Sequence, residues 1–186
     1  MQREYTIVRT SFWRGQYSAR AADGRELYAV RTSGSKTKFF VPGDEQPRFE
    51  TRPRSFFSSE VVLVESAVDY IFASIKPSGG ELKWEVRDCA SAILGILIHG
   101  TKTIKPLDLK GWSSWKVLKE TGRKYKEMAR HLEFQVDEKP IVTFDLAKDY
   151  KSVTVKVIGQ VRGVDERIVL AMAFRCLTIS TQQSSG

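Results

Sequence analysis

The C-terminal segment, residues 163–179, is apolar on nearly every side, and this restricts the folds open to the chain. Residues 168–174 form an uninterrupted apolar run, and apolar residues resume directly after Arg175. Asp165 is well placed as the N-cap of a helix that begins near Glu166, because both carboxylates suit the positive end of the helix dipole. Arg175 interrupts the apolar run well short of the roughly twenty residues that a membrane span needs. Since such a helix has no polar stripe to present to water, we expect it to be surrounded by protein.

Most of the remaining chain shows the pattern of short strands. Asp23 and Gly24 separate two extended runs, 16–22 and 25–31, which is a strong signal for a β-hairpin. Leu82, Trp84 and Val86 alternate with polar residues and are expected to share one face of a strand. Segments with strand composition or period-two alternation lie at 38–41, 60–65, 69–75, 81–86, 131–136, 141–145 and 152–158.

Two further segments are ambiguous. The apolar run 90–98 is predicted as a buried strand, although periodicity alone does not separate a buried strand from a buried helix. Residues 123–130 fit either a short amphipathic helix or an edge strand. Roughly ten to twelve short strands with few helical patterns predict a sandwich or a closed barrel. A sheet that closes around the apolar helix would bury the helix and remove the sheet edges together, with Arg175 beside a carboxylate or at the barrel mouth.

Composition and cysteine usage agree with one globular domain. A chain of 186 residues with 41% apolar side chains can build a sizeable core, so we expect a single domain over 1–180 and a disordered tail at 181–186. The N-terminus lacks the apolar run of a secretory signal, which predicts a soluble, cytoplasmic protein. Cys89 and Cys176 lie in apolar stretches where buried thiols are expected, with a disulfide as the less favoured alternative.

Both ends of the chain carry a pattern found in a known superfamily. Residues 5–30 run from an aromatic through a short strand and Asp-Gly to a second strand, and residues 152–174 combine a strand with an Asp that precedes the hydrophobic helix. This resembles the Tubby C-terminal-like superfamily, which includes the plant LURP-one-related proteins and the phospholipid scramblases. The resemblance implies an all-β fold with one buried helix: a closed antiparallel barrel of about twelve strands around a central hydrophobic C-terminal helix.

The sequence offers little that predicts catalysis. His99 ends an apolar run and His131 heads a strand, and neither lies in a nucleophile motif. There is no glycine-rich phosphate loop, and no Cys/His cluster has metal-ligand spacing. We therefore expect a non-enzymatic binding or adaptor module with no catalytic residues, no metal site and no cofactor.

The best candidate binding region is the basic stretch from Lys102 to Arg130. It contains nine basic and three acidic residues. Most of the excess of basic over acidic residues, which gives the chain its net charge of +8, therefore lies in this stretch. Such a stretch attracts anionic partners, and Tubby-like proteins bind phosphoinositide headgroups through basic residues on the barrel surface. We expect anionic phospholipid headgroups or an acidic protein to bind here, with peripheral attachment to membranes. The lipid- or anion-binding residues predicted are Lys116, Lys119, Arg123, Lys124 and Lys126.

Other interpretations of these residues stay open. The lysines also fit an ordinary solvated face, and Trp112 and Trp115 fit packing at a barrel end better than insertion at a membrane interface. A second basic cluster, residues 48–54, is predicted to be loop-like. An enzyme-like barrel that holds a small apolar ligand is one alternative. A nucleic-acid-binding protein is another, supported by a pI near 9.5 but by no recognised motif.

Overall fold

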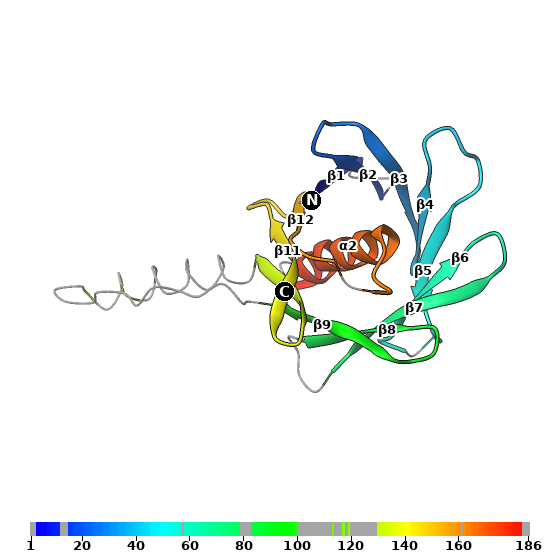
Figure 1. Cartoon of the computed structure of the whole chain (residues 1–186). Coiled ribbons are helices and arrows are strands. Elements are labelled where there is room, and N and C mark those ends of the chain that lie inside the picture. Colours follow the sequence, from blue (N-terminus) through cyan, green and yellow to red (C-terminus); the bar gives the residue numbers. More distant parts are fainter. Residues whose placement is uncertain are drawn as a thin grey trace.

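The structure is a computed structural model, and it describes residues 3–11, 15–56, 58–78, 83–99, 113, 117, 119, 130–160 and 162–183. In these parts of the chain, twelve antiparallel strands form a closed barrel around one long helix, α2 (Glu166–Gln183), as Figure 1 shows. Strands adjacent in sequence are paired, and β1 pairs with β12 to close the ring, which confirms the predicted fold class. The strands are β1 (Arg3–Ser11), β2 (Gln16–Ala21), β3 (Glu26–Ser33), β4 (Lys36–Phe40), β5 (Phe49–Pro53), β6 (Val61–Glu65), β7 (Tyr70–Pro77), β8 (Lys83–Asp88), β9 (Ile93–His99), β10 (His131–Val136), β11 (Lys139–Leu146) and β12 (Ser152–Val157).

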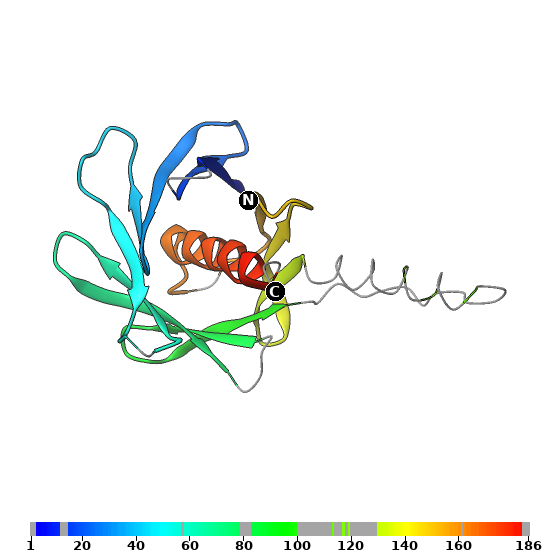
Figure 2. The same ribbon diagram turned by 180° about the vertical axis from the view of Figure 1, so that it is seen from behind.

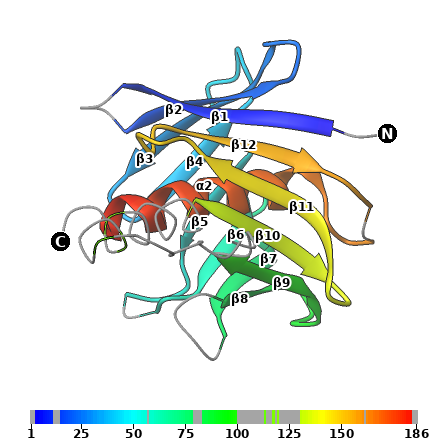
Figure 3. The same cartoon turned by 90° about the vertical axis from the view of Figure 1, so that its left-hand side faces the viewer.

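The strand order gives the barrel two distinct ends. Odd-numbered strands lead away from the end where α2 begins, and even-numbered strands return to it. We call the end of the barrel where α2 begins the entry end, and the end where α2 finishes the exit end. Figure 3 shows α2 crossing the barrel between the two ends, with the N-terminus of the chain on the entry side. The view from behind in Figure 2 shows the same ring of strands around the helix.

Side chains of α2 fill the interior of the barrel, as the apolar run predicted. Every residue from 168 to 174 is at most 4% exposed, and Cys176 and Leu177 are buried too. Phe174 makes edge-to-face contacts with Tyr17 and Phe39, at centroid distances of 5.0 and 6.2 Å. Phe39 in turn stacks on Phe49 at 4.2 Å. Burial of one large apolar side chain contributes about 1.5–3 kcal/mol, so this helix supplies a large share of the core.

The start of α2 is fastened to the barrel wall. Asp165 Oδ1 accepts hydrogen bonds from the backbone N–H groups of Arg167 (2.9 Å) and Ile168 (3.2 Å), which confirms the predicted N-cap. The Arg167 guanidinium bonds Asp165 and also Glu65, the last residue of β6. It lies 4.2 Å from the centre of the Phe72 ring, so one side chain combines two ion pairs with a cation–π contact.

Arg175 is half-buried, between the buried residues Phe174 and Cys176 of α2. It makes no ion pair with a carboxylate of the described residues, so the carboxylate partner expected for Arg175 is not observed there. Burial lowers the pKa of its guanidinium. Its partial access to water relieves the cost of placing a charge on this helix.

Most of the predicted strands are present. The hairpin predicted at Asp23-Gly24 joins β2 to β3, but its loop is longer than the two residues expected. The N–H of Ala21 donates to the carbonyl of Arg25, and Gly24, with a positive φ of 85°, takes the left-handed position in the loop between them. Trp84 and Val86 are buried together on β8, while Leu82 lies outside the described residues. The other predicted strands correspond to β4, β6, β7, β10, β11 and β12.

The structure corrects three expectations. Residues 48–54 are not a loop, because Phe49–Pro53 is strand β5 and Phe49 is fully buried. The strand predicted at 90–98 is β9, but it is not buried throughout: Leu97 is 0% exposed, whereas Ile93 at its start is 57% exposed. Cys89 is exposed in the β8–β9 connection rather than buried.

Two other expectations are only partly covered by the structure. The segment 123–130, left open between helix and edge strand, lies outside the described residues except for Arg130. Helix α2 continues to Gln183, three residues into the segment predicted as the tail. The domain boundaries therefore stay a prediction.

Candidate functional site

The charges of the barrel are divided between its two ends. The entry-end connections are 22–25, 41–48, 66–69, 89–92, 137–138 and 158–165, and they contain three basic and seven acidic residues. The exit-end connections are 12–15, 34–35, 54–60, 78–82, 100–130 and 147–151, and by sequence they contain thirteen basic and six acidic residues. The net charge of +8 is therefore concentrated in the connections that leave the barrel where α2 ends.

The predicted binding stretch belongs to this basic set. It connects β9 with β10, so it leaves and rejoins the barrel at the exit end. Of the predicted site residues only Lys119 is described; it is helical and exposed. The remaining four, Lys116, Arg123, Lys124 and Lys126, and the two tryptophans Trp112 and Trp115 lie outside the described residues.

Four lysines that the sequence analysis did not single out extend the basic character onto the barrel wall. Lys36 and Lys38 on β4, Lys76 on β7 and Lys83 on β8 alternate with buried residues and face outward near the exit end. None of the four makes an ion pair with a described residue. Their positive charges are thus available to a partner, and the alternation around Thr37 and Phe39 is the signal that could have revealed the first two.

The acidic residues on the same part of the wall are neutralised by neighbours. Glu50 pairs with Arg52 at 3.2 Å, and Glu60 pairs with Arg54 at 3.0 Å. Glu85 accepts a hydrogen bond of 2.9 Å from Arg87, and this contact, with a second from Ser78, lowers the pKa of its carboxyl group. The surface charge of β4 to β8 near the exit end is therefore dominated by the four lysines.

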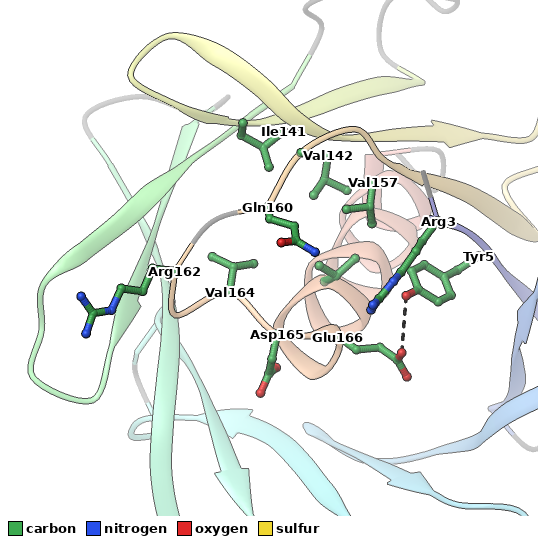
Figure 4. Close-up of a pocket in the computed structure, with 12 residues that line it drawn as sticks. Arg3, Tyr5, Ile141, Val142, Val157, Gln160, Arg162, Val164, Asp165 and Glu166 are labelled. Carbon is green, nitrogen blue, oxygen red and sulfur yellow. Dashed lines mark hydrogen bonds between the residues drawn. The ribbon is translucent and has the colours of Figure 1, made fainter. Parts of the chain in front are cut away.

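A separate hollow of about 540 Å³ lies at the entry end, between β1, β11, β12 and the start of α2 (Figure 4). Its walls are formed in part by apolar side chains, Ile141, Val142, Val157, Val164 and Val169. Its polar lining consists of Arg3, Tyr5, Gln160, Arg162, Asp165 and Glu166. We call it the helix-entry pocket.

The carboxylates of the helix-entry pocket are already engaged in structural contacts. The Tyr5 hydroxyl donates to Glu166 Oε2 at 3.4 Å, and burial, reinforced by the Glu166 charge, raises the pKa of Tyr5. Asp165 caps α2 and binds Arg167. Figure 4 shows Gln160 directed toward the centre of the hollow and Arg162 directed away from it. The pocket suits a small molecule with polar and apolar parts better than it suits acid–base chemistry.

The two histidines considered as catalytic candidates lie elsewhere. His131 on β10 lies between Asp145 (Nδ1 to Oδ1, 2.8 Å) and Glu133 (Nε2 to Oε1, 3.3 Å) on the outer face of the barrel. Both ring nitrogens are thus occupied by carboxylates. His99 is the last residue of β9, and its side chain lies outside the described part of the structure.

Neither a metal site nor a membrane-spanning helix is found in the part of the chain that the structure describes. No three His, Cys, Asp or Glu side chains there are grouped so that they could hold a metal ion. No helix there combines the length and the apolar character that crossing a bilayer requires.

Comparison with known proteins supports the fold. The X-ray structure of a protein from Arabidopsis thaliana is similar, with a TM-score of 0.57 over 96% of this chain and 91% of that one. The two sequences are 11% identical over this alignment. The likeness shows the fold alone. No family model and no curated protein matches the sequence.

Proposed function

We propose that this protein is a non-enzymatic binding or adaptor module of the Tubby-like, LURP-one-related type. Its exit end attaches to anionic membrane surfaces, with phosphoinositide headgroups as the preferred anion and the cytoplasm as the compartment. The observation that carries the proposal is the separation of charge between the two ends of the barrel, with basic connections at the exit end and acidic connections at the entry end.

Simple electrostatics supports attachment by the exit end. Each basic residue near an anionic bilayer contributes about 1 kcal/mol, and this attraction falls off within about 10 Å at moderate salt. If basic and acidic residues were mixed at both ends, the attraction of the basic residues to the bilayer and the repulsion of the acidic residues would cancel within this distance. Since the acidic connections lie at the far end of the barrel, the basic ones act with little opposition.

The packing of the interior supports a surface function over an apolar ligand held inside the barrel. The side chains of α2 from Ile168 to Phe174 are almost completely buried against the strands. A ligand in the centre of the barrel would have to displace this helix, which would expose a large apolar area to water.

The proposal predicts that charge reversal in the β9–β10 connection removes binding to anionic vesicles. The variant carries Lys116→Glu, Lys119→Glu, Arg123→Glu and Lys124→Glu. At about 1 kcal/mol per residue, we expect vesicle affinity to fall at least a hundredfold, with an unchanged midpoint of thermal unfolding. Sedimentation with phosphatidylcholine vesicles that contain phosphatidylserine or a phosphoinositide measures the effect.

Two controls make this experiment decisive. Pure phosphatidylcholine vesicles are expected to leave the wild-type protein in the supernatant, and added salt is expected to weaken binding to the anionic vesicles. Equal binding of wild type and variant would contradict the proposal. So would a wild-type protein that shifts nucleic acid but ignores vesicles at the same salt concentration.

The helix-entry pocket supports a second candidate, the binding of a small amphiphilic molecule. Its volume of about 540 Å³ lies in the range of known ligand sites, and it combines an apolar lining with arginine, tyrosine and glutamine side chains. Native mass spectrometry of the purified protein would reveal a retained ligand as a defined mass increase.

A further inference from the structure

The connection between β5 and β6 presents an aromatic side chain to solvent at the exit end. Phe56 is 93% exposed, the highest value among the exposed large apolar side chains of the described residues. In the sequence it lies two residues after Arg54, between Ser55 and Phe57. Exposure of a phenylalanine to water is unfavourable, so a surface that covers it would gain free energy.

The backbone around Phe56 forms a defined turn. The N–H of Ser58 donates to the carbonyl of Ser55 at 3.0 Å, which places Phe56 at a central position of a β-turn. The N–H of Arg54 donates to the carbonyl of Glu60 at 3.0 Å and closes the base of this connection. The turn is therefore held at its base and projects Phe56 from its tip.

This turn adjoins the basic wall of the barrel. It follows β5 directly, and β5 pairs with β4 in the register Thr37↔Thr51. The turn thus leaves the barrel beside the start of β4, which carries Lys36 and Lys38. An apolar tip next to lysines that pair with no described carboxylate is the combination that peripheral proteins use at anionic bilayers.

We propose that the barrel docks on an anionic lipid bilayer with this face of the exit end, the Phe56 turn entering the boundary between headgroups and acyl chains. Lys36 and Lys38 contact the headgroups beside it. This inference rests on the proposed function and extends it, because it names the surface and the orientation. The acidic entry end points away from the membrane, where its charge is repelled least.

The shape of the surface favours a bilayer over other anionic partners. Lys36 and Lys83 lie four interstrand steps apart, from β4 to β8, which at about 4.8 Å per step corresponds to nearly 20 Å along the curved barrel wall. A single small anion cannot contact charges spread so widely. Single-stranded nucleic acid binds grooves in which successive bases stack on aromatic side chains, whereas Phe56 lies on a projecting turn.

Substitutions at the turn and at β4 test the inference separately. Phe56→Ser should weaken partition to vesicles that contain phosphatidylserine about tenfold, because the phenyl ring then no longer enters the interface. Phe56→Trp should retain binding, since tryptophan favours the membrane interface. Lys36→Glu combined with Lys38→Glu should weaken partition about thirtyfold or more.

Matched controls lie at the entry end. Val68 is 70% exposed in the β6–β7 connection, so Val68→Ser removes an exposed apolar side chain far from the proposed surface. Arg25→Glu combined with Lys139→Glu lowers the net charge by the same amount as the β4 pair, and both residues are exposed. We expect both controls to bind vesicles within about twofold of wild type, and circular dichroism to show that all variants remain folded.

The outcomes separate this inference from the proposed function. If wild-type protein binds anionic vesicles and Phe56→Ser or the Lys36/Lys38 pair binds equally well, the docking surface is wrong while the proposed function stands. Equal loss in the entry-end controls would also overturn it, because net charge alone would then explain binding. If wild-type protein binds no anionic vesicle, or binds only nucleic acid, both proposals fail together.

Discussion

Cys89 and Cys176 both lie in apolar stretches of the sequence, yet only Cys176 is buried. Cys176 belongs to α2 and is 0% exposed inside the barrel, and burial raises the pKa of its thiol. Cys89 begins the short connection between β8 and β9 at the entry end, so it reaches solvent. The chemical environment of each thiol is set by the element that carries it rather than by its sequence neighbours.

Thiol alkylation of the native protein should therefore proceed in two stages. Cys89 is expected to react with iodoacetamide at pH 8, whereas Cys176 is expected to react only after unfolding, because the thiolate is the reactive form and burial disfavours it. Mass spectrometry of the native and urea-treated protein would give one and two adducts. Modification of Cys176 at the same rate as Cys89 in the native protein would contradict the position of α2.

The arginines of residues 48–54 show the same dependence on tertiary structure. From the sequence, this cluster was predicted to be a loop-like basic site. In the structure Arg48, Arg52 and Arg54 pair with Glu65, Glu50 and Glu60 respectively. These side chains are therefore committed to the barrel wall, and the lysines of β4 supply the available charge instead.

Among the secondary-structure elements, α2 has the clearest local signal. Its N-cap, its first residue and its apolar length were all expected from residues 163–179. Its tie to the wall through Arg167 and Glu65 was not, because the two residues are 102 positions apart in the sequence. Local capping thus starts the helix, and a long-range ion pair fastens it to β6.

Replacement of Asp165 should destabilise the protein through the lost cap. Asp165→Ala removes two hydrogen bonds to backbone N–H groups and the contact with Arg167, so we expect a loss of about 1–2 kcal/mol in the free energy of unfolding. Asp165→Asn keeps a capping oxygen and should lose less. Urea denaturation measures both, and an alanine variant within about 0.5 kcal/mol of wild type would show that the cap is unimportant.

Strand β9 shows how one glycine allows close packing. The run 90–98 was predicted as a buried strand, although its periodicity alone did not separate a strand from a helix. In the barrel, a Cβ at Gly95 would lie 2.6 Å from the carbonyl oxygen of Gln135 and 2.5 Å from the Phe134 ring. The absence of a side chain at this position lets the Phe134 ring fill the inner face of β9.

At the scale of the whole molecule, barrel closure and helix burial depend on each other. The pairing of β1 with β12 leaves no edge strand, and the closed ring leaves an interior that α2 fills. Without the helix, the inward aromatic residues would face an empty space. Without closure, the apolar face of α2 would meet water.

A charge at the centre of α2 should therefore prevent stable folding. Met172 is 0% exposed, and Met172→Asp would bury a carboxylate in the core at a cost of several kcal/mol, comparable with the total stability of a domain. Met172→Leu conserves volume and should cost less than about 1.5 kcal/mol. Thermal unfolding followed by circular dichroism distinguishes the two variants.

Amide hydrogen exchange provides an independent test of the same architecture in the wild-type protein. Residues 168–177 are expected to exchange only through global unfolding. Rapid exchange across them, or an aspartate variant as stable as the parent, would contradict the central position of the helix.

The local pattern of the chain was enough to determine the buried helix, its cap, most strands and the presence of a basic segment between β9 and β10, because period, turn chemistry and charge are properties of neighbouring residues. The assignment of connections to the two ends was decided only by the tertiary structure. Strands alternate in direction, so overlooking one strand, such as β5, transfers every later connection to the wrong end. The charge division between the ends, the β4 lysines that pair with no described residue, and the exposed position of Phe56 depend on that alternation and on ion pairs between distant residues, which no local pattern contains.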